Sequence, residues 1–132
     1  MGCLFCIKVK LSISPLIELW LGIGYGILPI VLYWIWKQYP PKKINQWYGY
    51  RTEMSKKNAD TWQEANNYAP RFFVPIGLLT MLFSVVCYTF LPSYAISVSR
   101  GLLFLIVSLI SVVLFTELHL HRVFDSHGKR RQ

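Results

Sequence analysis

Three long hydrophobic runs constrain the fold of this chain more than any other feature. They cover about residues 15–36, 72–91 and 95–116, and their only charged residues are Glu18 and Arg100, near the ends of the first and third runs. A helix of about 20 residues at 1.5 Å per residue crosses a hydrocarbon core of roughly 30 Å. The chain is therefore predicted to be an all-α integral membrane protein, with three transmembrane helices in a single domain over residues 1–132.

The composition is that of a membrane protein, and it limits the classes of partner that we expect. Of the 132 residues, 54% are hydrophobic, which exceeds the roughly 45–50% of an ordinary soluble domain. The formal net charge is +8, but the basic residues flank the hydrophobic runs and form no separate basic domain, so we expect no nucleic-acid partner. The expected partner is a lipid bilayer with an anionic inner leaflet, which attracts each nearby Lys or Arg by about 1 kcal/mol.

The distribution of Lys and Arg predicts the orientation in the membrane, because cytoplasmic loops are enriched in both. Seven of them lie between residues 37 and 71, and four lie between residues 117 and 132. With three spans these two segments share one side, whereas the other side carries Lys8, Lys10 and Arg100. We therefore expect an outer N-terminus, with the polar segment 37–71 and the basic tail 117–132 in the cytoplasm.

Small residues and cysteines leave alternatives open. Gly22 and Gly26 form a Gly-x-x-x-Gly pair, which lets another helix backbone approach closely. Packing within the monomer and dimerisation both fit this pair, so the sequence does not define the oligomeric state. Cys3 and Cys6 supply only two of the four ligands of a structural zinc site, so we expect interfacial thiols and no metal or other cofactor.

The polar segment 37–71 is predicted to contain a short helix. It would begin between Ser55 and Asn58, either of which can supply the N-cap oxygen, and would end at Ala69-Pro70. One face of this helix would carry Trp62, Ala65, Asn66 and Ala69. A large aromatic residue beside small ones suits a cytoplasmic interfacial helix that lies on the membrane surface or on the ends of the spans.

Residues that precede this helix are candidates for binding. Arg51 can hold a carboxylate or a phosphate through two parallel hydrogen bonds. Tyr48 and Tyr50 suit headgroup depth, where the rings are in apolar surroundings and the hydroxyls are wet. For Arg51 and Tyr50 we favour a binding role. An architectural role is an equal alternative for Gly49, Trp62 and Asn66.

Two ordered motifs lie at opposite ends of the region that follows the first span. The first reads Asn45-x-x-Tyr48-Gly49-Tyr50-Arg51-Thr52, then Ser55-x-x-Asn58, then Trp62-x-x-Ala65-Asn66. The second reads Glu117-x-x-Leu120-x-x-x-Phe124-Asp125-x-x-Gly128-x-Arg130. Together the two motifs resemble the signature of the SdpI family, small integral membrane proteins of bacteria.

The resemblance implies a function at the bacterial cytoplasmic membrane. It implies immunity-type protection against a membrane-active toxin peptide, or capture of a regulatory protein at the membrane. By the same resemblance, the functional patch comprises Tyr50, Arg51, Thr52, Ser55, Asn58, Trp62 and Asn66. One alternative is an accessory or docking subunit of a larger membrane complex. A second is a membrane enzyme that acts on lipid headgroups or peptides.

Catalysis and metal binding find little support in the sequence. It contains no evident nucleophile-base pair, phosphate loop or inward-facing acidic pair, so we expect no enzyme. Glu117, His119 and His121 do not predict a metal site, because residues two apart on a helix point to nearly opposite sides. We expect Glu117 to meet Arg51 or Arg71 of the polar segment instead.

Overall fold

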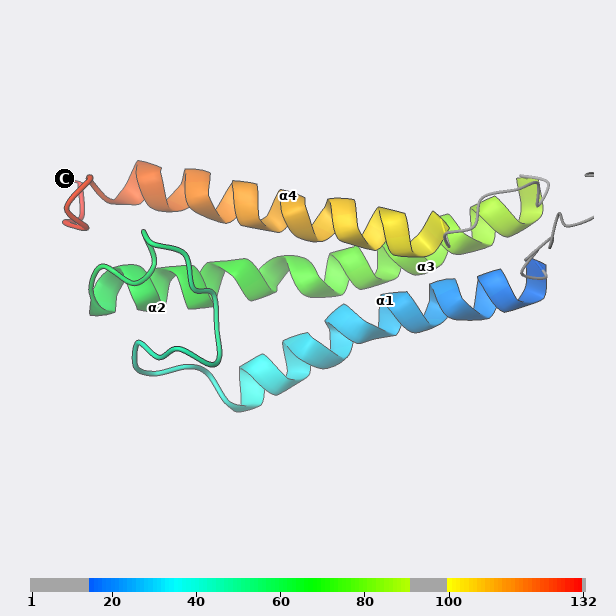
Figure 1. The fold of residues 1–132 in the computed structure, drawn as a ribbon, viewed down its shortest axis with the longest axis horizontal. Helices are drawn as coiled ribbons and strands as arrows, with labels where there is room; N and C mark the ends of the chain where they lie inside the picture. The colour runs from blue at the N-terminus through cyan, green and yellow to red at the C-terminus, as the bar shows by residue number, and fades with distance from the viewer. Residues whose placement is uncertain (1–14, 91–99, 132) are drawn as a thin grey trace, which may run out of the picture.

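The computed structural model of the chain describes residues 15–90 and 100–131. Its elements, in chain order, are α1 (Pro15–Gln38), α2 (Ala59–Tyr68), the 3-10 helix η1 (Ala69–Phe72), α3 (Phe73–Phe90) and α4 (Arg100–Val123) (Figure 1). Three helices are long and apolar enough to cross a membrane, and the described ranges contain no strand. The prediction of an all-helical protein with three spans is confirmed.

Some expectations concern residues outside the described ranges. These are the roles of Cys3 and Cys6 and the tight turn between the second and third spans.

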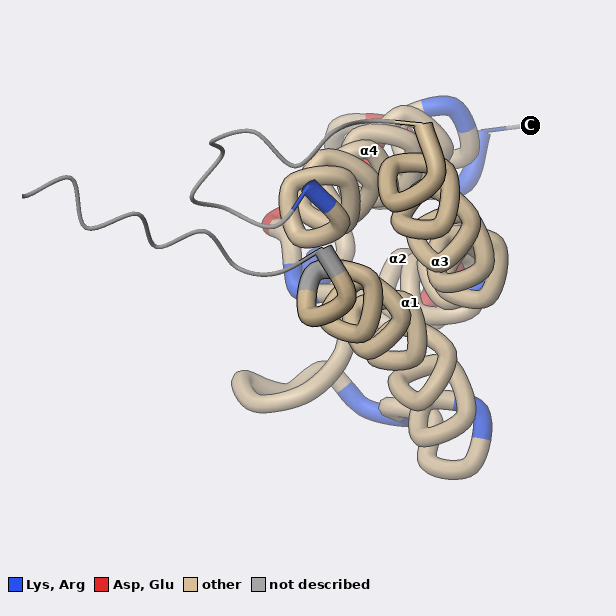
Figure 2. Tube along the Cα trace, turned by 90° about the vertical axis from the view of Figure 1, so that its right-hand side faces the viewer, with Lys and Arg blue, Asp and Glu red and all other residues tan. Residues whose placement is uncertain are grey.

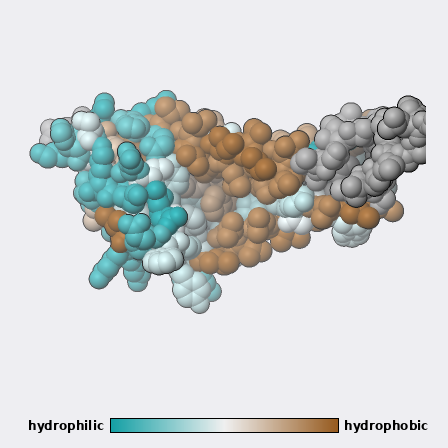
Figure 3. Space-filling view, in the orientation of Figure 1, coloured by the Kyte–Doolittle hydropathy of each residue, from teal (hydrophilic) through white to brown (hydrophobic). Residues whose placement is uncertain are grey.

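The three long helices lie side by side in a narrow bundle. Viewed end-on, α1, α3 and α4 are neighbours (Figure 2), and α3 makes its most extensive contacts with α1. Hydrophilic residues gather at the end of the bundle that carries α2 and the C-terminus, whereas hydrophobic residues cover the visible face of the helices (Figure 3). We name this hydrophilic end the polar cap and define it as residues 39–72 and 124–131.

Glycines bring α1 and α3 into backbone contact. A Cβ atom added to Gly26 would lie 2.6 Å from the carbonyl oxygen of Gly77, and one added to Gly77 would lie 2.5 Å from the carbonyl oxygen of Gly26. A Cβ atom on Gly22 would collide with the Ser84 side chain. The Gly22 and Gly26 pair therefore packs against a helix of the same chain, which is one of the two alternatives that the sequence allows.

The polar segment forms a helix as expected, but its direction differs from the one expected. Residues Ala59–Phe90 make one nearly continuous helical rod, in which α2 lies end to end with α3 and not across the ends of the spans (Figure 1). Pro70 lies in the first turn of the intervening η1, where its missing N–H costs little. The helical path thus continues through the proline.

The last helix is longer than its hydrophobic run. α4 continues to Val123, so residues 117–123, which we expected in the basic tail, are helical. Leu120 on this extension is fully buried. The last turns of α4 therefore pack within the polar cap.

Candidate functional site

The N-terminus of α2 organises the loop that precedes it. Asn58 is the N-cap residue: its Oδ1 accepts the Thr61 N–H at 2.8 Å, and Thr61 Oγ1 accepts the Asn58 N–H at 3.1 Å. This reciprocal arrangement is a capping box. Ser55, the other candidate cap, donates its hydroxyl to the carbonyl oxygens of Tyr50 and Thr52, each at 3.0 Å. Thr61 was not among the predicted site residues, although its spacing from Asn58 could have indicated it.

Asn66 fixes the tightest part of the loop. Its Oδ1 accepts the backbone N–H of Tyr50 at 2.6 Å, and its Nδ2 donates to the carbonyl oxygen of Trp62 at 2.9 Å. Gly49, next to Tyr50, has φ +111°, a backbone conformation that residues other than glycine rarely adopt. A Cβ atom there would lie 2.6 Å from Asn66 Oδ1. The loop backbone can approach Asn66 only because residue 49 is glycine.

Two further side chains anchor the start of the loop. Trp62 is only 1% exposed, and its Nε1 donates to the carbonyl oxygen of Pro41 at 2.6 Å. Asn45 Oδ1 accepts the N–H groups of Trp47 at 3.0 Å and Tyr48 at 2.7 Å. These bonds define the path of residues 41–50, and the bond from Trp62 also gives a buried polar group the partner that it requires.

Tyr50 connects the loop to the end of α4. Its hydroxyl lies 3.0 Å from Glu117 Oε1 and 3.1 Å from the carbonyl oxygen of Val113. Burial and the Glu117 carboxylate raise the pKa of Tyr50 well above its ordinary value. The side chain is buried within the protein, and its hydroxyl therefore pairs with Glu117 and not, as we had expected, with water.

Glu117 has a different partner from the one expected. It accepts a hydrogen bond from the hydroxyl of Tyr50, whereas Arg71 donates its Nε–H to the carbonyl oxygen of Asn67 at 3.2 Å. Arg51 is exposed. The expectation that Glu117 pairs with Arg51 or Arg71 is therefore wrong. The physical reason is the fold of the loop, which turns Tyr50 toward α4 and the next residue toward solvent.

The second motif includes the last turns of α4 and the turn that follows this helix in the chain. Leu120 and Phe124 are buried. Asp125 Oδ1 accepts the backbone N–H groups of Lys129 at 2.8 Å and His127 at 2.9 Å, and the bond from Lys129 is the main reason that the pKa of Asp125 lies below its usual value. The tail thus folds back on the last turn of α4.

This turn contacts the N-terminus of α2 directly. Asn58 Nδ2 donates to the carbonyl oxygen of Gly128 at 2.7 Å, and Lys57 Nζ donates to the carbonyl oxygen of Ser126. Gly128 has φ +80°, and a Cβ atom there would lie 2.8 Å from Asn58 Nδ2. The two sequence motifs therefore meet in space and form one folded unit.

An ionic cluster also joins α2 to the C-terminal segment. Glu64 Oε1 lies 2.8 Å from His119 Nε2, and Glu64 Oε2 lies 3.4 Å from Arg130 Nη2. The His119 ring stacks on Tyr68 with ring centroids 3.9 Å apart. Sequence analysis missed Glu64, because its partners lie 55 and 66 residues further along the chain and no local pattern signals such a pairing.

The histidines of α4 take separate directions. His119 contacts Glu64 on α2, whereas His121 lies 3.8 Å from Glu117 one turn back on its own helix. Within residues 15–90 and 100–131, no three His, Cys, Asp or Glu side chains gather closely enough to hold a metal ion.

The outer face of the cap differs from its interior. Among the predicted site residues, only Arg51 is exposed, and it forms no hydrogen bond or ion pair within the described ranges. Trp47, in the same loop, is 92% exposed. Tyr48 is half-buried against Trp36, with ring centroids 5.4 Å apart, and burial raises the pKa of Tyr48. Thr52 Oγ1 accepts the Ser55 N–H at 3.3 Å.

Comparison with known proteins supports the family resemblance. Residues 42–117 match the sequence profile of the SdpI/YfhL protein family. A curated protein of Bacillus subtilis (strain 168), the uncharacterized protein YfhL, is 40% identical over 58 residues, which are 44% of this chain and 53% of YfhL. The match thus spans about half the length of that relative. No solved structure matches the chain.

Proposed function

The chain belongs to the SdpI/YfhL family, and from this premise we propose that it protects its cell against a membrane-active toxin peptide, with Arg51 as a contact residue. The family profile begins in the polar cap and ends at Glu117, so it includes the whole first motif. Protection is the function that the resemblance of this motif implies.

One observation carries the choice of Arg51. Its neighbours Tyr50 and Ser55 are buried and bonded within the cap, whereas Arg51 is exposed and has no partner in the described part of the chain. A guanidinium offers parallel donors that match a carboxylate or a phosphate. The exposed indole of Trp47 adds a large apolar surface of the kind that is enriched at contact sites.

A second candidate function is to hold a regulatory protein at the membrane. The excess of Lys and Arg in segment 37–71 and in the tail favours a cytoplasmic polar cap and an outer N-terminus. A cytoplasmic cap would be accessible to soluble proteins of the cell. A reporter fused to Gln132 tests this orientation. Reporter activity confined to the outside of the cell would show that the orientation is the opposite one.

A survival assay tests protection. Cells that express the protein, its Arg51→Ala variant or no protein are exposed to a panel of membrane-permeabilising peptides. We expect selective survival against at least one peptide with the unaltered protein, and loss of most of that survival with Arg51→Ala. Membrane levels of each variant are matched by immunoblotting.

The matched control is Lys56→Ala, which removes one positive charge from another exposed position of the same loop. It should leave survival unchanged, since its charge lies outside the proposed contact. Equal killing of all cells across the panel would refute protection against these peptides. Equal loss with both variants would mean that net charge, and not Arg51, determines protection.

A further inference from the structure

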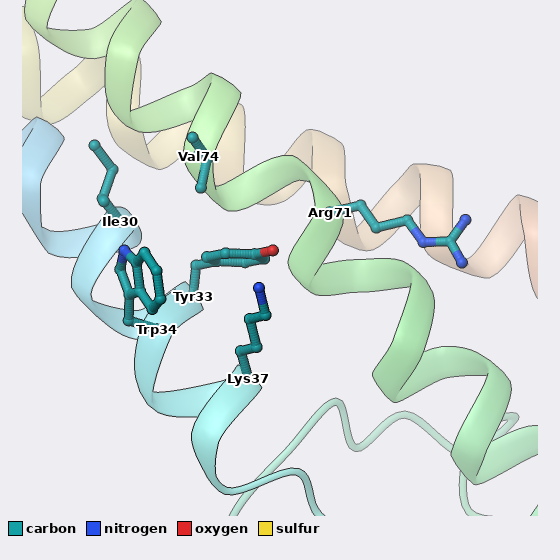
Figure 4. A pocket seen from close by; sticks show the side chains of 6 residues that line it. All are labelled: Ile30, Tyr33, Trp34, Lys37, Arg71 and Val74. Carbon is teal, nitrogen blue, oxygen red and sulfur yellow. The ribbon is translucent and has the colours of Figure 1, made fainter.

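A groove opens on the side of the bundle between α1 and the start of α3. It has a volume of about 560 Å³ and is lined by Ile30, Tyr33, Trp34, Lys37, Arg71 and Val74 (Figure 4). Tyr33 and Lys37 of α1 point toward the neighbouring helix, whereas the guanidinium of Arg71 extends away from them. The groove is separate from the hydrogen-bonded interior of the polar cap.

The rim of the groove is positively charged. Lys37 and Arg71 line it, and no acidic residue does. Lys37 Nζ lies 5.5 Å from the centroid of the Trp34 ring and 6.0 Å from that of Tyr33, and it has no ion-pair partner in the described ranges. The Arg71 guanidinium is turned away from the groove: its Nε–H donates to the carbonyl oxygen of Asn67, and its Cζ lies 5.8 Å from the centroid of the Tyr68 ring. An anion in the groove would therefore meet the Lys37 ammonium and no acidic side chain.

The walls of the groove are apolar and continue into the spans. Ile30 lies about two turns before Lys37 on α1, and Val74 lies in the first turn of α3. Lys37 lies in the last turn of α1 and Arg71 in η1, just before α3, so the basic rim lies where the long apolar helices meet the polar cap. Figure 3 shows the hydrophilic and the hydrophobic surface on either side of such a boundary. In a bilayer this boundary coincides with the headgroups, and basic pockets between membrane helices at that depth bind anionic headgroups.

We propose that this groove binds one anionic phospholipid, with its phosphate at Lys37 and its acyl chain along Ile30 and Val74. Lys37 is the ligand of the phosphate because its ammonium faces the groove, whereas Arg71 adds only a positive charge at the rim. Trp34, which is 61% exposed, covers the glycerol region at the depth that interfacial aromatic residues prefer. The proposal does not depend on toxin protection.

Native mass spectrometry of the full chain in detergent tests the proposal. Phosphatidylglycerol and phosphatidylcholine of equal chain length are added, and retained lipid is counted for each variant. We expect tighter binding of phosphatidylglycerol, weakened about five-fold by Lys37→Gln and less by Arg71→Gln. Val74→Trp should also reduce retention, because it fills the groove and leaves both cations in place.

Lys42→Gln is the matched control, since it removes one charge from an exposed position outside the groove. Thermal unfolding of each variant establishes that it is folded. Equal retention of both lipids, or equal weakening by Lys42→Gln and Lys37→Gln, would overturn the proposal. Displacement of the lipid by soluble glycerol phosphate would also overturn it, because the site would then recognise a free phosphate and not a lipid.

Discussion

The seam between α1 and α3 and the interior of the polar cap are stabilised in different ways. At the seam, Gly26 and Gly77 allow backbones to touch, and hydroxyl groups such as that of Thr80 bond to carbonyl oxygens of their own helix. In the cap, side chains such as Asn66 and Asn58 bond to backbone atoms 16 and 70 residues away. Inside the bilayer no hydrophobic force draws helices together, so the fit between their surfaces determines how α1 and α3 pack. In the cap, the need to pair every buried polar group determines how the loop folds.

The largest expected effect on stability comes from a steric clash at the seam between α1 and α3. Gly26→Ala places a Cβ atom 2.6 Å from the Gly77 carbonyl oxygen and should lower the free energy of unfolding by about 3 kcal/mol. Gly24 has no atom within 4 Å of its added Cβ, so Gly24→Ala should be neutral or stabilising by up to about 1 kcal/mol. Thermal unfolding in detergent measures both variants. Equal effects would mean that the seam tolerates separation.

The next largest effect on stability comes from the loss of a buried hydrogen bond in the polar cap. Asn66→Ala removes the acceptor of the buried Tyr50 N–H, and an unpaired buried donor costs about 2 kcal/mol. The neighbouring Asn67 is exposed, so Asn67→Ala should change stability by less than about 0.5 kcal/mol. Hydrogen exchange of the Tyr50 amide is the direct measurement. If this amide stays protected in Asn66→Ala, the proposed bond is not what protects it.

A smaller effect concerns the link from the cap to α4. Tyr50→Phe removes the hydroxyl that contacts Glu117 and should cost about 1.5 kcal/mol near neutral pH. The raised pKa of Tyr50 favours the neutral hydroxyl in the folded state. Its contribution is therefore complete below about pH 10, the ordinary value for tyrosine, and declines as the pH rises further.

The pH dependence separates this link from a simple loss of packing. Above about pH 10, the unaltered protein should lose more stability as the pH rises than Tyr50→Phe does. Tyr39→Phe, at an exposed tyrosine, should follow the unaltered protein. Identical slopes for the unaltered protein and Tyr50→Phe would contradict the role assigned to the Tyr50 hydroxyl.

The smallest expected effect on stability is that of Arg51→Ala, which should stay within about 0.5 kcal/mol of the unaltered protein. Arg51 is exposed and forms no hydrogen bond or ion pair in the described ranges. Thermal unfolding and survival measured on the same variant would therefore separate folding from function. A large loss of stability would assign Arg51 to the interior of the cap and remove the basis for the proposed contact.

Local patterns in the sequence predicted much of the fold. The lengths of the hydrophobic runs indicated three spans, and an oxygen at residue 55 or 58 indicated where α2 begins. The shared face of Trp62 and Asn66 is indeed buried. These features depend on residues within a few positions of one another, so the sequence contains all that is needed to infer them. The choice between Asn58 and Ser55 required the structure, because Ser55 caps the loop carbonyls instead.

The predicted site residues divide in a way that the sequence does not reveal. Tyr50 and Arg51 are adjacent and were both favoured for binding, yet Tyr50 is buried against Glu117 and Arg51 faces solvent. The positive φ of Gly49 and its approach to Asn66 set the direction in which each side chain points. A one-dimensional pattern contains both residue types but not this direction.

The sequence by itself determined that this protein is helical, that it has three spans and that its polar residues gather in two motifs. Tertiary structure decided that the two motifs meet, that α2 continues into α3, and that the glycine pair of α1 packs on α3. The physical reason is the range of the interactions. Hydrophobic length and capping act between near neighbours, whereas the partners of Asn58, Glu64 and Tyr50 lie 55 to 70 residues away, and only the folded chain brings them together.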